Sequence, residues 1–312
     1  EYIIGKNEAG QRFDKYIFKL LKNAGTGLIF KQLRNKNIVL NGKKAKRNEI
    51  LHENDSVRIF MSDDTINKFT GGPLHISKTG FRLDVIYEDD DILLASKPVG
   101  VLSQKSSDKD ISMNEYLIEY LTDNGFGKEN LATFKPSFCN RLDRNTSGLM
   151  IAGKSLRGLQ KMSEIIKDRS IHKFYLTIVK GIVDKKSVIK GYLRKDEKNK
   201  KVVLYDNPVK DSYEIHTEYE PLATKDDMTL LKVRLITGKT HQIRAHLAGI
   251  SHPVLGDFKY GDKVFNEKYG EKKQLLHSYQ VVFPKLDDFP DISEKSFNTP
   301  YPVNFTKYFK EN

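Results

Sequence analysis

The chain has 312 residues, of which 38% are hydrophobic and 30% are charged. This composition supports a packed core and argues against a wholly disordered chain, and the length allows a large domain with a small companion. The sequence contains no long apolar run and no signal-peptide pattern at its start, so we expect no membrane span and a cytoplasmic location. The single cysteine, Cys139, excludes an intramolecular disulfide and a cysteine-based metal cluster.

The net charge of +12 is unevenly distributed along the chain. Residues 1–62 contain thirteen basic and six acidic residues, a net of +7, which leaves +5 for the remaining 250 residues. A small basic module of this kind is suited to phosphate backbones, although a solvated lysine-rich surface is the ordinary alternative. The charge therefore points to a nucleic acid as a partner.

The apolar pattern predicts the elements of this basic module. Helical spacing of apolar residues predicts one helix over residues 10–21 and a second over residues 28–34. A turn at Asn41-Gly42, the basic run 43–47 and a strand over residues 56–60 follow, which together indicate a hairpin. Acidic Asp14 falls early in the first helix, where it meets the helix dipole favourably and needs no catalytic explanation.

The rest of the chain divides into a linker and a second domain. Residues 63–80 are polar and contain a Gly-Gly-Pro stretch, which is typical of an interdomain linker. From residue 81 onward, short strands and helices occur without a regular period, which favours an α+β fold over a doubly wound one. The predicted strands span residues 92–95, 149–152, 175–179, 201–205 and 230–235, and the predicted helices span 114–121 and 159–166.

The segment from Asn140 to Gly148 carries the most distinctive chemistry. Asp143 lies between two arginines, Arg141 and Arg144, just before a glycine-ended turn. Neighbouring positive charges favour the carboxylate form, so Asp143 could serve as a nucleophile or as an anchor for a ligand. Asp, Asn, Thr and Ser are also common in turns and helix caps, and the local pattern alone favours that structural interpretation.

Other short motifs do not support a site. Gly238-Lys239-Thr240 resembles the end of a phosphate-binding loop, but the earlier glycine that such a loop requires is replaced by Val233. Gly125-Phe126-Gly127 similarly lacks the last glycine of a dinucleotide-binding loop. Three histidines, at positions 241, 246 and 252, lack the spacing of a zinc motif, so we expect no metal.

Five separated segments of the chain form an ordered set of motifs: residues 87–103, 140–148, 173–175, 237–247, and 275–278 followed by 283–284. Together they resemble the RluA/RluC/RluD family of pseudouridine synthases, in the order expected for that family. Asn140 departs from the family pattern, which commonly has His there, but Asn can still form local hydrogen bonds.

This resemblance implies a fold, an activity and a set of catalytic residues. The implied fold is α+β, the pseudouridine synthase fold with a long mixed, largely antiparallel sheet crossed by a cleft. The implied reaction detaches uracil from ribose, turns it and rejoins it through carbon 5, which a single carboxylate can support without a cofactor or metal. Asp143 matches the family's essential aspartate, Arg244 matches the arginine that pairs with it, and Tyr175 matches the tyrosine that lies against the target base.

The resemblance also implies residues that bind RNA. A uridine in folded RNA must be extruded before it reacts, and Arg141 matches the arginine that enters the helical stack. Lys97 and Lys173 are expected to contact phosphates. Residues 1–62 are similar to the small αL RNA-binding module named after ribosomal protein S-four, and this similarity nominates residues Arg12, Lys31, Arg34, Asn41, Lys43 and Lys44.

The expected organisation is therefore an RNA-binding module at 1–62, a linker at 63–80 and a catalytic domain at 81–312. We expect a monomeric isomerase of uridines in RNA, most often large-subunit ribosomal RNA for family members with such a module. Two alternatives remain: a non-enzymatic RNA-binding or ribosome-assembly factor on the same scaffold, and a glycosidase or base glycosylase. A glycosidase normally needs two facing carboxylates, and the sequence offers no second candidate beside Asp143.

Overall fold

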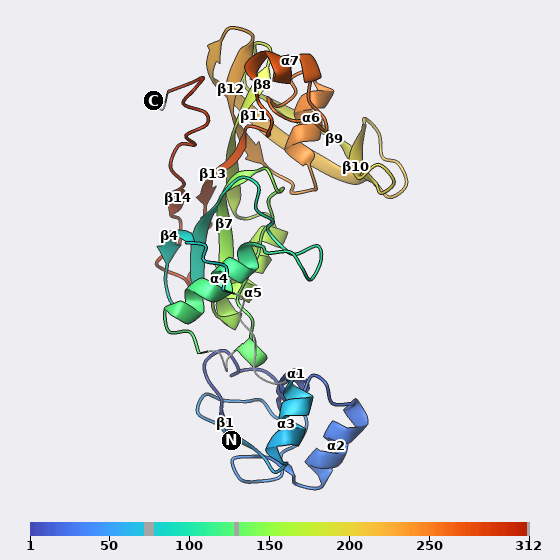
Figure 1. Ribbon diagram of the computed structural model, residues 1–312, viewed down its shortest axis with the longest axis vertical. Helices are drawn as coiled ribbons and strands as arrows, with labels where there is room; N and C mark the ends of the chain where they lie inside the picture. The colour runs from blue at the N-terminus through green and yellow to red at the C-terminus, as the bar shows by residue number, and fades with distance from the viewer. Residues whose placement is uncertain (72–77, 128–130, 311–312) are drawn as a thin grey trace.

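The computed structural model describes residues 1–71, 78–127 and 131–310. A small module at the N-terminus lies below a larger, elongated domain, and a narrow waist separates the two (Figure 1). The division into domains at 1–62 and 81–312 stays a prediction, and residues 72–77 of the expected linker lie outside the described residues. None of the helices in the described ranges is long and apolar enough to cross a membrane.

The small module is a short sheet packed against two helices, in agreement with the apolar pattern. Phe13 and Ile17 from the first helix, with Ile29 and Leu33 from the second, are buried in its core. Asn41 and Gly42 both have positive φ, which suits the tight turn of a hairpin. The elements are β1 Tyr2–Ile3, α1 Phe13–Leu20, α2 Thr26–Arg34, β2 Ile38–Leu40 and β3 Ser56–Ile59, with strand order β1-β3-β2.

The start of the expected linker differs in the structure. Residues 63–70 form helix α3 (Asp63–Thr70), which ends at Gly71 in the left-handed conformation. Phe69 packs against the core of the small module, and its carbonyl accepts a hydrogen bond from the amide of Asn23 (2.9 Å). The sequence analysis did not predict this helix because the segment is mostly polar. Only the face that carries Phe69 packs against the module. The folded part of the module therefore extends to about residue 71.

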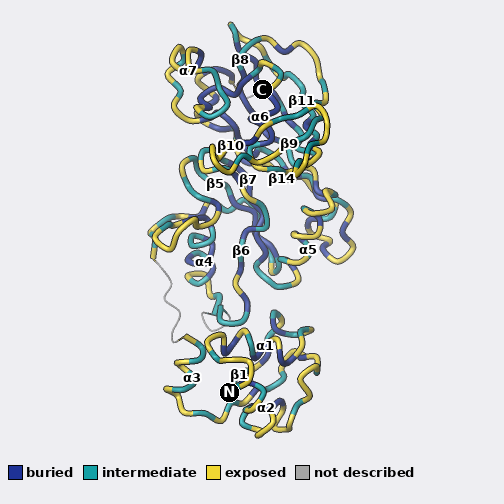
Figure 2. Tube along the Cα trace, turned by 90° about the vertical axis from the view of Figure 1, so that its right-hand side faces the viewer, coloured by how far each residue is buried: buried dark blue, intermediate teal, exposed yellow. Residues whose placement is uncertain are grey.

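The large domain is built on one long mixed sheet. In the part of the chain that the structure describes, eleven strands follow the order β10-β9-β11-β12-β8-β13-β7-β5-β4, with β14 beside β13 and β6 beside β7. All pairs are antiparallel except β13 with β7, which confirms the expected α+β fold. The strands that form the centre of the sheet in Figure 2 are largely buried.

The predicted strands and helices of the large domain are all present, mostly a few residues longer than expected. The strands are β4 Asp84–Glu88, β5 Ile92–Lys97, β6 Ser137–Phe138, β7 Ser147–Gly153, β8 His172–Lys180, β9 Ser187–Asp196, β10 Lys201–Tyr205, β11 Tyr213–Lys225, β12 Met228–Leu235, β13 Leu276–Val282 and β14 Ser296–Asn298. The helices are α4 Met113–Asp123, α5 Leu156–Lys167, α6 Gln242–Gly249 and α7 Lys263–Tyr269. Helix α6 is buried over residues 242–247, so it lacks the one-sided apolar pattern that marks a surface helix.

Gly148 explains how the parallel pair forms next to the Asp143 loop. A Cβ atom at this position would lie 2.2 Å from the carbonyl oxygen of Ser278, and the φ of +106° favours glycine. The absence of a side chain lets β13 approach the start of β7, where Ser278 pairs with Gly148. The loop that carries Asp143 is thereby anchored at its C-terminal end to the middle of the sheet.

Candidate active site

The Asp143 loop connects β6 to β7 and is fixed on both sides of the aspartate. On one side, the hydroxyl of Ser103 donates to the carbonyl of Leu142 (2.8 Å) and accepts from its amide (2.9 Å). On the other side, the carbonyl of Arg144 accepts hydrogen bonds from the amide of Gly100 (2.8 Å) and from Nζ of Lys97 (3.0 Å). These bonds hold the backbone of Asp143 in one place before any ligand arrives.

Lys97 has a different position from the one expected. Its side chain is fully buried, and Nζ donates to the carbonyls of Pro98 (3.0 Å), Val101 (2.8 Å) and Arg144 (3.0 Å). Burial lowers the pKa of this amine to about 8. With its three donors engaged inside the protein, Lys97 does not reach a phosphate in this structure. Lys97 instead supports the Asp143 loop from inside the protein, through its hydrogen bond to the carbonyl of Arg144. The structure therefore does not place Lys97 as the expected phosphate contact.

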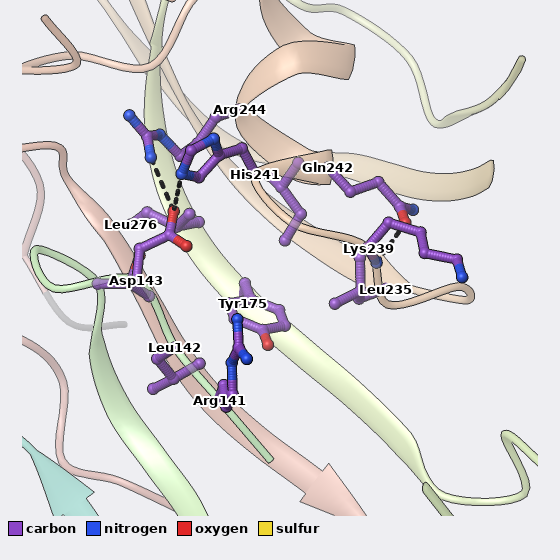
Figure 3. A pocket seen from close by; sticks show the side chains of 12 residues that line it. Arg141, Leu142, Asp143, Tyr175, Leu235, Lys239, His241, Gln242, Arg244 and Leu276 are labelled. Atoms are coloured by element: carbon purple, nitrogen blue, oxygen red, sulfur yellow. Dashed lines mark hydrogen bonds and ion pairs between the residues drawn. The ribbon is translucent and has the colours of Figure 1, made fainter. Parts of the chain in front are cut away.

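Arg244 lies on α6, and its side chain points toward Asp143 (Figure 3). Its Nη1 donates to Oδ2 of Asp143 at 2.7 Å, a charge-assisted hydrogen bond between residues 101 positions apart in the chain. The side chain of Arg244 is only 8% exposed, whereas about a quarter (26%) of the Asp143 side chain is exposed. The arginine therefore comes from the protein interior, and the carboxylate faces the cleft.

Two residues near this pair were missed by the sequence analysis. Asp257, 1% exposed, binds the far edge of the Arg244 guanidinium at 2.7 and 2.8 Å. His241 was considered only as a metal ligand; its Nε2 lies 3.9 Å from Oδ2 of Asp143, and its Nδ1 lies 2.9 Å from the hydroxyl of Tyr260. Burial lowers the pKa of His241, so the neutral ring is favoured. His241 has a positive φ and directly precedes α6, the helix that carries Arg244.

Tyr175 stands on β8 and turns its ring toward the same cavity. It is 5% exposed, and burial raises the pKa of its hydroxyl to about 12, so the phenol stays neutral. The exposed Arg141 lines the cavity together with Tyr175 (Figure 3). An aromatic face beside a carboxylate can receive a flat base while the acid meets the sugar.

A second, adjoining cavity, which shares Asp143 and Tyr175 with the cavity of Figure 3 but is not lined by Arg244, has a volume of about 430 Å³. This volume lies within the range of ~300–1,000 Å³ for small-molecule sites. Lys173 lines it and is partly buried, and burial lowers the pKa of its amine. The walls combine one acid with several basic and apolar side chains, which suits a neutral base on an anionic backbone. The cavity is lined by Cys139, Asn140, Arg141, Leu142, Asp143, Ile166, Lys173, Tyr175, Leu235, Gly238, Lys239, Thr240 and His241.

The residues proposed for RNA binding in the small module are all exposed but differ in their partners. The guanidinium of Arg12 forms two bonds to Asp14, at 2.7 and 3.1 Å. The amide side chain of Asn41 bonds to Asp55 and to the amide of Ser56, both at 2.8 Å, and so closes the hairpin. The other four form no ion pair with any residue that the structure describes: Lys31, Arg34, Lys43 and Lys44.

Comparisons with known proteins identify the family to which the chain is similar. The family model for RNA pseudouridylate synthase matches residues 91–249, a span that contains Asp143, Tyr175 and Arg244. The chain is 31% identical over 304 residues (95% of this chain, 93% of the relative) to a Mycoplasma genitalium protein described as "Uncharacterized RNA pseudouridine synthase MG370". It is 29% identical over 290 residues (90% and 84%) to the ribosomal large subunit pseudouridine synthase C of Pasteurella multocida.

A solved structure, that of human RNA pseudouridylate synthase domain containing 4, has the same fold. It covers 72% of this chain and 90% of its own length, with a TM-score of 0.58 and 20% identity. Family membership does not favour the non-enzymatic alternative. Asp257 does not provide the second facing carboxylate of a glycosidase, because it is buried behind Arg244. The chain belongs to the RNA pseudouridylate synthase family and is an isomerase that converts uridine to pseudouridine in RNA.

Proposed function

We propose that this enzyme modifies uridines of large-subunit ribosomal RNA and that Asp143 is the essential carboxylate. The observation that carries the catalytic assignment is the 2.7 Å bond from the buried Arg244 to Asp143 at the edge of a cavity that Tyr175 also lines. Arginine keeps its proton at all ordinary pH values. Arg244 can therefore orient Asp143, but it cannot neutralise the carboxylate by transferring a proton to it.

The carboxylate has two possible roles at the nucleotide. It can act as a nucleophile, or it can transfer a proton at the ribose, while the C–N bond breaks and the C–C bond forms. Either role requires a free carboxylate oxygen next to the sugar. Tyr175 would hold the flat face of the uracil, which tolerates rotation of the base because stacking does not depend on the ring's hydrogen-bonding edges.

The choice of ribosomal RNA depends on the relatives and on the small module. Several relatives are named ribosomal large subunit pseudouridine synthase C, and the alignments with two of them cover 90% and 96% of this chain. Lys31, Arg34, Lys43 and Lys44, which form no ion pair among the described residues, would contact the phosphates of a folded RNA outside the cleft. Arg141 and Lys173 would contact the RNA at the cleft itself.

A tritium-release assay tests the reaction and the substrate together. The full-length protein is incubated with RNA that is tritiated at uracil carbon 5, either fragments of large-subunit ribosomal RNA or transfer RNA. We expect tritium release, with the RNA chain intact and no free uracil, at a higher rate on the ribosomal fragments. Free uracil would indicate a glycosylase instead, and faster release from transfer RNA would overturn the proposed substrate.

Mapping pseudouridine in cells identifies the natural substrate. Total RNA from cells with and without the gene is compared at single-nucleotide resolution. Loss of one or more pseudouridines from large-subunit ribosomal RNA supports the proposal, and restoration by the wild-type gene but not by an Asp143→Asn gene assigns that loss to this site. Loss confined to transfer RNA would contradict it.

A further inference from the structure

We propose that Asp257 is a positioning residue for the reaction, and this inference depends on the proposed role of Asp143. Asp257 holds the Nε–Nη2 edge of the Arg244 guanidinium and so fixes the group in the orientation in which Nη1 donates to Asp143. Asp143 is then held through one oxygen only, and its second oxygen stays open to the nucleotide.

The geometry around Arg244 divides the guanidinium between two acids. Nε and Nη2 donate to Oδ2 and Oδ1 of Asp257 at 2.7 and 2.8 Å, a bidentate arrangement. Nη1 donates to Oδ2 of Asp143 at 2.7 Å. Within the described ranges of the chain, Oδ1 of Asp143 accepts no hydrogen bond, and the side chain is 26% exposed. The open oxygen is therefore available on the cavity side.

Asp257 is itself held rigidly. Its Oδ1 also accepts hydrogen bonds from the amides of Lys259 (2.7 Å) and Tyr260 (3.1 Å), and the amide nitrogen of the Asn266 side chain donates to its backbone carbonyl (3.1 Å). A Cβ atom on Gly261 would lie 1.9 Å from that same carbonyl, so the turn tolerates only glycine there. The turn from 257 to 261 thus presents a fixed carboxylate to Arg244.

Tyr260, from the same turn, restrains the other neighbour of Asp143. Its ring lies beside the Arg244 guanidinium, 5.2 Å from its centroid to Cζ, and its hydroxyl lies 2.9 Å from Nδ1 of His241. The hydroxyl also accepts a hydrogen bond from the amide of Val202 on β10 (2.8 Å). One short turn therefore fixes both Arg244 and His241 on the interior side of Asp143.

The charges explain why an acid is needed at position 257. With Asp257 ionised, the three groups comprise two carboxylates and one guanidinium, and Asp257 keeps the Nε–Nη2 edge of Arg244 occupied. Without Asp257, the arginine is free to turn its two-nitrogen edge to Asp143 and to bind both of its oxygens. Such a shift of about 1 Å in a reacting group can cost about 100-fold in rate.

Asp257→Asn tests this role, because the amide keeps the size of the side chain but places an N–H against the guanidinium. We expect kcat on ribosomal RNA fragments to fall by about 10- to 100-fold while KM and the RNA dissociation constant change by less than about twofold. Asp262→Asn is the matched control: Asp262 lies in the same segment, caps α7 and binds Lys180 rather than Arg244. It should leave kcat unchanged.

A double-mutant cycle separates positioning from a purely structural effect. In an Arg244→Gln background, Asp257→Asn should change kcat by less than about twofold, because Asp257 acts through Arg244. An equal loss in both backgrounds would overturn the proposal, as would an unchanged kcat for Asp257→Asn. If the asparagine variant fails to fold, Asp257→Glu, which keeps the charge but shifts the carboxylate, should show the same selective loss of kcat. Wild-type turnover by Asp143→Asn would instead refute the proposed role of Asp143 and leave the Arg244 pairing itself untouched.

Discussion

The two parts of the molecule use basic residues in opposite ways. In the small module, Lys31, Arg34, Lys43 and Lys44 are exposed and form no ion pair with the residues that the structure describes. In the large domain, Lys97 and Arg244 are buried and direct their donors at named carbonyl and carboxylate oxygens. Cations of the first kind remain available for phosphates, whereas those of the second kind fix the shape of the site.

This contrast shows that the role of a lysine or arginine cannot be inferred from its residue type alone. A lysine in a sequence suggests a surface charge, and this led to the expectation that Lys97 binds RNA. A buried lysine with three carbonyl acceptors stabilises a loop instead, because each lost hydrogen bond would leave a carbonyl unsatisfied. Removing cations from the two regions should therefore produce different kinds of defect.

Arg244→Gln should produce the largest loss of stability. Removing the guanidinium leaves Asp143 and the buried Asp257 without their common partner, and breaking a buried ion pair costs about 3–5 kcal/mol. Urea unfolding followed by circular dichroism measures the loss. A loss below about 1 kcal/mol would show that the three groups are not coupled in the folded state.

Lys97→Met should destabilise the protein without changing how RNA binding depends on salt. The carbonyls of Pro98 and Val101 lose their donor, at about 1–3 kcal/mol for each group left unsatisfied, partly offset by the apolar side chain, while the carbonyl of Arg144 keeps its bond to the Gly100 amide. The slope of log K against log salt should equal that of the wild type. A slope reduced by about 1 would mean that Lys97 does neutralise a phosphate after all.

Acidification should weaken the large domain through its buried histidines. Burial lowers the pKa of His246 and of His277 to about 4, below the ordinary value of 6.5. Between pH 6.5 and 4, these histidines are protonated in the unfolded chain but not in the folded protein. The free energy of unfolding is therefore highest above pH 6.5 and falls by about 3 kcal/mol for each histidine as the pH drops to 4.

Urea unfolding at pH 7 and at pH 4.5 measures this loss. Replacing His277, whose ring nitrogens bond to Ser147 and Thr299, with Gln should reduce the difference between the two pH values. An identical difference in the variant would exclude His277 as its source.

Replacing Lys43 and Lys44 together with Gln should have the smallest effect, limited to binding. If both side chains contact phosphates, the salt slope should fall by about 1.5, with turnover at saturating RNA unchanged. Lys285→Gln removes an exposed lysine that is paired with Asp287 in the large domain and serves as the control. An unchanged slope in the double variant would remove the hairpin from the RNA-binding surface.

The sequence predicted the elements that follow local rules. Apolar spacing located α1, α2, α4 and α5, and the Asn41-Gly42 pair located the turn of the small module. The resemblance to a family nominated Asp143, Tyr175 and Arg244, and the structure brings them to one cavity.

What could not be predicted depends on contacts between distant segments. The sequence analysis did not single out Asp257, because its partner Arg244 comes from helix α6 and no local pattern links the two residues. Helix α3 was read as linker, because its polar surface outweighs the packing of Phe69 on the small module. The burial of Lys97 and Asp257 depends on the tertiary fold, so no local sequence pattern predicts it.

The most direct test measures the RNA dissociation constant and the single-turnover rate for two full-length variants side by side. Asp143→Asn should lose isomerisation while its RNA affinity changes by less than about tenfold, because the neutral amide keeps its shape at the cleft. The quadruple variant Lys31→Gln, Arg34→Gln, Lys43→Gln, Lys44→Gln should lose affinity and keep the single-turnover rate at saturating RNA. Turnover at the wild-type rate by Asp143→Asn would contradict the assignment of the chemistry to this carboxylate.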